Sequence, residues 1–385
     1  DRRANCTNPV IKKMAEIRTA YLSKGINKTL INNEKILVRD YKLVISVTID
    51  GKPDKESLIE FENFKTSFEN NLSNIGFCPE YIKPKGLINI IDELLNREEG
   101  FKERERRYNQ HIDLNKQMIH PDLSVIVDKD GLAFNDTVVR GVAIKEYPIQ
   151  ESFARTMDLI GDILNNNAQI TGQFLYVTNI WFPDISSLKT KVNAKSARAK
   201  QNADSPMAKW VPDFAKKNRD WEEALKILSD GQGMCYLNQS LFVFAEAGDS
   251  NHAVSDLMDV FSSKGWDVQP VSFIQLPVFL SALPMQFDNT CYQHIRKLGL
   301  TRLLPQWNIV NLILATGEWR GNSYDNGMIF VGRRGQLAIQ DIFESEGNYN
   351  VAIAADSGAG KSFFMNDLIV SYLGLGAKIF IIDVG

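Results

Sequence analysis

The sequence has few of the residues that build metal centres or disulfide frameworks. Its four cysteines, Cys6, Cys78, Cys235 and Cys291, lie far apart and form no Cys-x-x-Cys pair, and its four histidines are equally scattered. This spacing indicates neither a zinc site nor a set of disulfides. It is typical of a reducing compartment, so we expect a cytoplasmic location.

Long apolar runs are missing as well. No stretch of about 18 uninterrupted apolar residues is present, and the best candidate, 271–285, is broken by Gln275, Pro277 and Pro284. We therefore expect no membrane-spanning helix. The chain opens with Asp-Arg-Arg-Ala-Asn, with neither an initiator methionine nor a signal peptide, so we expect it to be part of a longer protein.

The chain also lacks a strong excess of charge of one sign. Its formal net charge is −3 over 385 residues, which gives no overall attraction to nucleic acid or membrane. Residues 189–200 are locally basic, without an acid and without an aromatic residue for base stacking. Basic stretches of this kind can neutralise phosphates. We interpret it as one face of an exposed helix, formed by Lys189, Lys191, Lys195, Arg198 and Lys200.

The most informative stretch lies near the end of the chain. Residues 349–355 are apolar and compatible with a strand, and helix-like spacing follows in 364–375. A second apolar strand is expected at 377–383, which continues a parallel βαβ pattern. The order of strand, glycine-rich turn, Lys-Ser and helix predicts a phosphate-binding loop. Its predicted ligand-contacting residues are Asp356, Ser357, Gly358, Ala359, Gly360, Lys361, Ser362 and Phe363.

Each residue type in this loop meets a physical requirement of phosphate binding. Gly358 and Gly360 let backbone N–H groups turn inward around a polyphosphate, and the next helix points its positive end at the same anion. Lys361 would contact the β and γ oxygens, and Ser362 would bind Mg²⁺ through its hydroxyl. One position departs from the usual G-x-x-x-x-G-K-S pattern, because Ala355 replaces its first glycine.

The pattern of the rest of the chain predicts alternating helices and strands. Residues 41–50 alternate like a half-buried strand, and the stripe formed by Leu58, Phe61, Phe64, Phe68, Leu72 and Ile75 predicts a helix packed in the core. Hairpins are expected at 124–144 and 328–343. Arg333 and Arg334 lie at the tip of the second hairpin, where they could contact a nucleotide or be solvated, and we favour solvated side chains. Further helices are expected at 9–23, 87–95, 153–164, 210–228 and 254–261, and further strands at 173–182, 241–245 and 266–273.

These patterns predict an α+β N-terminal region followed by an α/β P-loop domain of the RecA-like type. The N-terminal region is expected at 1–300 as ferredoxin-like sandwich units, with a possible division into subdomains near 115–150. A connecting segment and hairpin follow at 301–348. Residues 349–385 are the start of the P-loop domain, which we expect to continue beyond Gly385.

Several short segments occur in the order of a known family. They are 41–46, 113–115, 208–212 with Trp221, 236–238, 279–284, 308–312 and the phosphate loop, of which the loop alone is specific by itself. On these segments the chain resembles the TraC-like ATPases of conjugative type IV secretion systems, in particular the F-type branch.

The resemblance implies a P-loop ATPase with ATP and Mg²⁺ as ligands, whose hydrolysis of ATP powers pilus assembly and substrate transfer. It implies a hexameric full-length protein, attached peripherally to the cytoplasmic face of the bacterial inner membrane. The implied partners are inner-membrane secretion components and a coupling ATPase. Only Lys361 and Ser362 carry over as principal ligands.

The Mg²⁺-binding acid, the catalytic glutamate and the arginine finger are expected beyond Gly385. No catalytic residue is therefore assigned, and the chain by itself is expected not to turn over ATP. The alanine at position 355 leaves the tightness of nucleotide binding open.

Two other functions compete with this interpretation. A HerA- or FtsK-like DNA translocase would share the loop but would need a basic DNA path, and the near-neutral charge argues against it. A non-catalytic interaction or scaffold module is the other, because residues 1–348 precede the first strand of the motor. Binding of nucleic acid is left open.

Overall fold

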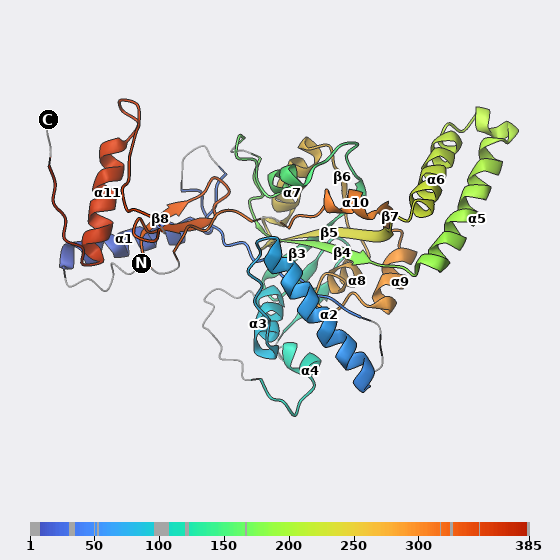
Figure 1. Cartoon of the computed structure of the whole chain (residues 1–385), viewed down its shortest axis with the longest axis horizontal. Helices are drawn as coiled ribbons and strands as arrows, with labels where there is room; N and C mark the ends of the chain where they lie inside the picture. The colour runs from blue at the N-terminus through green and yellow to red at the C-terminus, as the bar shows by residue number, and fades with distance from the viewer. Residues whose placement is uncertain are drawn as a thin grey trace. The chain divides into compact units, whose positions relative to one another are not determined.

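A computed structural model describes residues 8–30, 35–49, 51, 54–95, 108–119, 123–165, 168–315, 317–323, 326–345 and 347–382. The chain forms two compact units (Figure 1). We call Val44–Phe153 and Gly172–Ile313 the sheet unit, and Asp1–Leu43, Ala154–Thr171 and Leu314–Gly385 the loop unit. This grouping differs from the sequential division predicted at 300 and 348, because packing joins segments that are distant along the chain.

The sheet unit is built on a seven-stranded antiparallel sheet in the order β1-β2-β3-β5-β4, with β6 paired to β3 and β7 paired to β5. This part of the chain combines helices with an antiparallel sheet, as an α+β fold does, and the ferredoxin-like arrangement stays a prediction. The strands are β1 (Val125–Val127), β2 (Leu132–Phe134), β3 (Thr137–Glu146), β4 (Gln173–Trp181), β5 (Met234–Glu246), β6 (Asp267–Pro270) and β7 (Arg302–Pro305).

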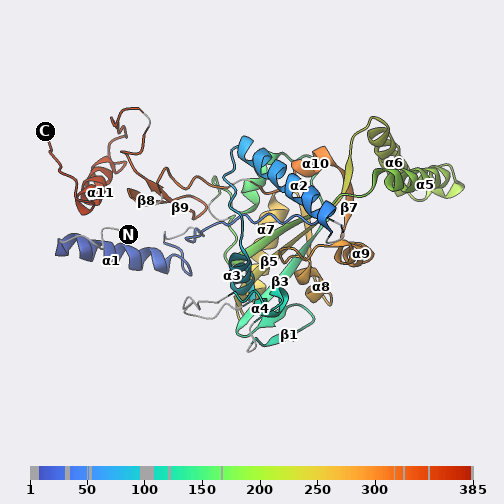
Figure 2. The same cartoon turned by 60° about the horizontal axis from the view of Figure 1, so that its bottom comes forward.

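The central strand β5 is covered on both faces. Its first eleven residues, 234–244, are all buried, so it does not alternate between core and solvent. Figures 1 and 2 show α7 on one face of the sheet and α3, α8 and α9 on the other. These helices are α3 (Pro84–Leu95), α7 (Ser250–Ser263), α8 (Gln275–Leu280) and α9 (Asn289–Lys297). Two short helices, α4 (Leu114–Met118) and α10 (Gln306–Val310), complete this part of the unit.

The core on the α3 side is aromatic at its centre. Phe242 of β5 and Phe134 of β2 both contact Phe279 of α8, with ring centroids 5.2 Å and 5.3 Å apart. Leu87, Ile91 and Leu95 of α3 pack onto the same cluster. Buried apolar surface of this extent is the main favourable contribution to folding.

The basic stretch lies on a helical hairpin, formed by α5 (Ile185–Ala203) and α6 (Asp213–Ser229) with a short 3₁₀ helix, η3 (Pro206–Lys209), between them. The Asp184 carboxylate caps α5 by accepting a hydrogen bond from the Ser187 backbone N–H at 2.7 Å. Leu188 and Val192 of α5 are buried against Ala224 and Leu228 of α6, while the lysines and the arginine are exposed. The predicted helix with a solvated basic face is confirmed.

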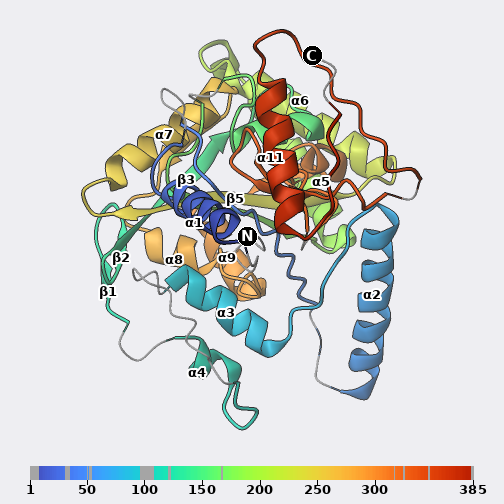
Figure 3. The same cartoon turned by 90° about the vertical axis from the view of Figure 1, so that its left-hand side faces the viewer.

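Helix α2 (Lys55–Asn74) corrects the predicted core stripe. The helix forms where expected, but none of its residues is buried, and Leu58 is 56% exposed. Figure 3 shows α2 at the margin of the sheet unit. The amphipathic pattern specified an apolar face, but Leu58, Phe61 and Phe64 on that face are exposed.

The strand predicted at 41–50 is also wrong over the described residues 41–49, which carry no strand. Leu43, Ile45, Val47 and Ile49 are exposed, between 38% and 53%. A strand requires a neighbour for its ladder of hydrogen bonds, and no described strand pairs with this segment. The alternation of apolar and polar residues therefore gives a row of apolar side chains here, but that row is not part of a sheet.

Most other predicted elements are present with changed limits. The expected strand at 132–144 is interrupted by a turn at Asn135, where φ is 51°, and becomes β2 and β3. Instead of a helix over 153–164, the structure has the 3₁₀ helix η2 (Phe153–Leu159). The strand expected at 241–245 is the second half of β5, and the strand expected at 266–273 shortens to β6.

The loop unit contains α1 (Pro9–Lys24), the hairpin of β8 (Met328–Val331) and β9 (Leu337–Gln340), and α11 (Lys361–Gly374). The hairpin confirms the one predicted at 328–343. The described residues of the two strands expected at 349–355 and 377–383 carry no strand, and residue 383 lies outside the described residues. The RecA-like domain therefore stays a prediction.

None of the helices in the described part of the chain is both long and apolar enough to cross a membrane.

Candidate phosphate-binding loop

The candidate site is the turn that leads into α11. Helix α11 begins at Lys361, directly after Gly360, whose φ is 87° and ψ is 16°. Gly358 has a φ of 81°, so both glycines adopt the left-handed conformation that other residues disfavour. A Cβ at either glycine would meet no atom within 4 Å, which shows that the space beside the loop is open.

The loop is closed by backbone hydrogen bonds and is exposed along its length. The Ala359 N–H donates to the Asp356 carbonyl at 3.1 Å, and the Phe364 N–H donates to the Gly360 carbonyl at 2.9 Å. Residues 356–363 are all exposed. Lys361 and Ser362 occupy the first turn of α11, where N–H groups without intrahelical partners give the helix its positive end. No acidic residue in that turn opposes an anion.

The structure brings all eight predicted ligand-contacting residues, 356–363, into this one turn and the helix start. Ala355 precedes it, and Ala355 is not among the described residues with a positive φ. An alanine side chain is therefore compatible with the backbone at the position where the usual pattern has glycine.

Helix α11 is anchored at its middle by α1. The Arg18 guanidinium donates to both carboxylate oxygens of Asp367, at 2.9 Å and 3.0 Å, and also to the Ile329 carbonyl of β8. One arginine thus joins α1, the hairpin and α11. Nη1 makes both contacts with the carboxylate, so Nη2 is left to hold the hairpin, and each of these hydrogen bonds is strengthened by the arginine charge.

A second anchor holds the C-terminal half of α11. The Tyr372 hydroxyl donates to Asp341 at 2.9 Å and accepts the Ile342 N–H at 2.7 Å, and its ring contacts Phe343 with centroids 5.3 Å apart. Burial raises the pKa of Tyr372 to about 12, so this hydroxyl keeps its proton at neutral pH. With the helix fixed at its middle and end, its N-terminus stays open to a ligand.

Neither anchor had a signal in the sequence. Arg18 and Asp367 are separated by 349 positions, and their pairing depends on how α1 and α11 pack. An arginine in an amphipathic helix and an aspartate in another are common features of exposed surfaces.

Arg334 has neither of the two roles suggested for the hairpin tip. Its side chain is 10% exposed and forms ion pairs with Asp158 at 2.9 Å and Glu318 at 3.0 Å. It also donates to the Gly161 carbonyl, while Arg333 donates to the Ile163 carbonyl at 3.1 Å. The preference for a solvated Arg334 was wrong, because segments distant in the sequence fold over the tip of the hairpin.

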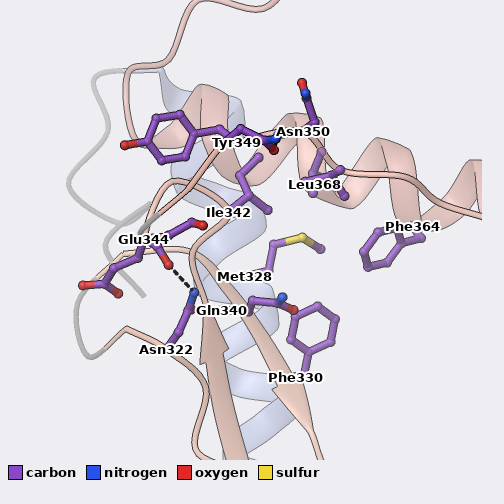
Figure 4. Close-up of a pocket in the computed structure, with 13 residues that line it drawn as sticks. Asn322, Met328, Phe330, Gln340, Ile342, Glu344, Tyr349, Asn350, Phe364 and Leu368 are labelled. Atoms are coloured by element: carbon purple, nitrogen blue, oxygen red, sulfur yellow. Dashed lines mark hydrogen bonds between the residues drawn. The ribbon is translucent and has the colours of Figure 1, made fainter.

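A cavity of about 290 Å³ lies beside α11 (Figure 4). Phe364 and Leu368 of α11 face Met328 and Phe330 of β8 across it, and Tyr349 covers another part of its wall. This volume is close to the lower limit of about 300 Å³ for small-molecule pockets. Lys361 and Ser362 do not line it, so the cavity and the phosphate loop are separate features of α11.

Comparison with known proteins gives the chain its family. The sequence profile of a family described as TraC protein matches residues 2–287. The chain is also 22% identical over 369 residues to Protein TraC of Escherichia coli (strain K12), an alignment that covers 92% of this chain and 42% of that protein. The chain thus spans less than half the length of this relative. Because the family profile matches well over half of its residues, the chain belongs to the TraC protein family.

Proposed function

We propose that this chain supplies the docking region and the phosphate-binding loop of an ATPase that powers conjugative type IV secretion, including pilus assembly and substrate transfer. The observation that carries the proposal is the open turn at Gly358–Gly360, which presents Lys361 and Ser362 at the exposed end of an anchored helix. It occurs in a member of the TraC family, between an apolar segment and a helix that carries Lys-Ser in its first turn.

The proposed ligands are ATP and Mg²⁺. The backbone N–H groups of residues 358–363 and the N-terminus of α11 would surround the phosphates, with Lys361 on their terminal oxygens. Ser362 would hold Mg²⁺, which neutralises charge on the phosphates when it is bound. Arg18 and Tyr372 do not contact the ligand in this proposal. They keep α11 in place, so that the loop stays preorganised.

The sheet unit is the proposed docking region. It has a buried hydrophobic core of its own, and the exposed apolar face of α2 is a surface that a partner can cover. We propose that it attaches the protein peripherally to inner-membrane secretion components, while the full-length protein works as a hexamer with a coupling ATPase as a further partner.

The decisive experiment replaces Lys361 with alanine in the full-length protein. Conjugative transfer and binding of a fluorescent ATP analogue should both be lost, because the substitution removes the charge that the phosphates meet. Lys378→Ala is the matched control, since it removes an exposed lysine of the same unit outside the loop. Unchanged transfer with Lys361→Ala would refute the motor assignment.

The exposed face of α2 also favours the second candidate function, a scaffold that acts by binding alone. The same variant separates the two functions. Under the ATPase proposal, Lys361→Ala protein still sediments with the membrane fraction through its partners, and high salt or alkaline carbonate releases it. Normal transfer by a protein that cannot bind ATP would support the scaffold alone.

A further inference from the structure

A small pocket of the sheet unit has a composition that the proposed ATPase function does not use. It has a volume of about 110 Å³ and lies where the end of β4, the start of α5 and α9 meet. Figure 1 shows these three elements converging at the base of the α5–α6 hairpin. Aromatic rings form its inner wall, and its outer part carries two cations, Lys191 and Arg296.

The faces of the aromatic rings are already occupied. Trp181 stacks on Tyr292 with centroids 4.7 Å apart and an angle of 6° between the rings, and Tyr236 packs against Tyr292 at 5.6 Å. The Arg296 guanidinium lies over the Tyr236 ring, 4.9 Å from its centroid, and 6.0 Å from that of Tyr292. The pocket therefore offers an arginine laid on aromatic rings that already pack against one another, which reduces the ring surface on which a nucleic-acid base can stack.

Neither cation of the pocket, Arg296 or Lys191, is held in an ion pair among the described residues, although the Lys191 charge acts on the Asp184 carboxylate. Asp184 also lines the pocket, but its carboxylate caps the N-terminus of α5. It accepts hydrogen bonds from the Ser186 hydroxyl and the Ser187 N–H, at 2.7 Å each. Two positive charges against one negative charge leave the pocket with a net charge of +1.

The size of the pocket restricts what can enter. A volume of 110 Å³ is well below the roughly 300 Å³ of typical small-molecule sites, and it is enough for one side chain. A planar carboxylate can accept two parallel hydrogen bonds from a guanidinium, and an acidic side chain carries it on a narrow stem that such a volume admits. A phosphodiester carries a sugar on either side, so its charged group cannot reach into so narrow a site.

We propose that this pocket binds the carboxylate of a glutamate or aspartate side chain from an acidic segment of a partner protein. Arg296 receives the carboxylate, and Lys191 adds a second charge at the rim. The exposed basic face of α5, which continues from Lys191 through Lys195 and Arg198, attracts the neighbouring acids of the same segment. The pocket thus selects one side chain, and the helix favours an acidic sequence around it.

The test uses the whole chain and a fluorescein-labelled hexaglutamate peptide, with binding followed by fluorescence anisotropy. Arg296→Gln and Lys191→Gln should each weaken binding about tenfold, the value of one charge-assisted hydrogen bond. Lys297→Gln and Lys189→Gln are the matched controls, because they remove the same charge from the same helices outside the pocket. They should change affinity about twofold or less. Equal losses in all four variants would show unspecific attraction and overturn the proposal.

Two further arms complete the experiment. Lys191 is exposed, so Lys191→Gln remains informative even where Arg296→Gln disturbs the packing of the rings, which near-UV circular dichroism would reveal. A labelled twelve-residue oligothymidylate should not show the same dependence on Arg296. If it does, the pocket is a nucleic-acid site and the acidic-segment proposal is wrong. Lys361→Ala should leave peptide binding unchanged, which keeps this test independent of the phosphate loop.

Discussion

The sheet unit buries the residues at its centre, whereas the loop unit leaves the residues of its candidate site exposed. In the sheet unit, β5 is buried along 234–244 and aromatic rings fill the space beneath it. In the loop unit, residues 356–363 are exposed, and α11 is held further along its length by Arg18 and Tyr372. The first arrangement gives stability, and the second keeps backbone N–H groups open to a ligand. A binding loop depends on anchors placed away from the ligand.

The same comparison holds inside the sheet unit, between β5 and α2. Phe242 of β5 is 1% exposed and Phe61 of α2 is 39% exposed, although both are phenylalanines on the apolar face of a regular element. Whether a residue contributes to the stability of the unit depends on what covers it.

The largest effect should come from the buried member of this pair. Phe242→Ala should lower the free energy of unfolding by about 3–5 kcal/mol, because it removes a buried ring and leaves a cavity beside Phe279. Urea unfolding followed by far-UV circular dichroism measures it. A loss below about 1 kcal/mol would mean that the core can collapse around the cavity and would weaken the contrast between the units.

The ion pairs of Arg334 should give the next largest effect. Arg334→Met should destabilise the loop unit by about 2–3 kcal/mol, because it leaves two largely buried carboxylates, Asp158 and Glu318, without their cation. Arg333→Met is the control at the adjacent, exposed position, and it should change stability by about 0.5 kcal/mol or less. Equal effects in the two variants would argue that Arg334 is solvated.

Substitution of a loop glycine should lower the affinity of the protein for an ATP analogue. Gly360→Ala requires an alanine at a φ of 87°, which costs about 1–2 kcal/mol, so affinity for an ATP analogue in the full-length protein should fall about tenfold. Ala355→Gly should change that affinity about twofold or less, because position 355 does not need a positive φ. A large gain with Ala355→Gly would show that the missing glycine limits the loop.

The smallest effect is expected on α2. Phe61→Ala should change the free energy of unfolding by about 1 kcal/mol or less, because Phe61 keeps 39% of its surface exposed and alanine favours the helix. The same urea titration used for Phe242→Ala measures it. A loss as large as that of Phe242→Ala would mean that the face of α2 is covered in solution.

Much of the local structure was predictable. The periodic apolar positions located α1, α2, α3, α6, α7 and α11, and the glycines at 358 and 360 with Lys361 and Ser362 located the candidate site. These signals work because helix periodicity and the left-handed conformation of glycine are properties of neighbouring residues.

The sequence by itself determined which faces are apolar and where the loop turns. Only the tertiary structure decided that the face of α2 lies open, that 41–49 has no neighbouring strand, and that Arg334 is buried between two carboxylates. It also decided that Arg18 holds Asp367. The physical reason is that burial, ladder pairing and ion pairs each need a second segment, and the distance between two segments along the chain says nothing about their distance in space.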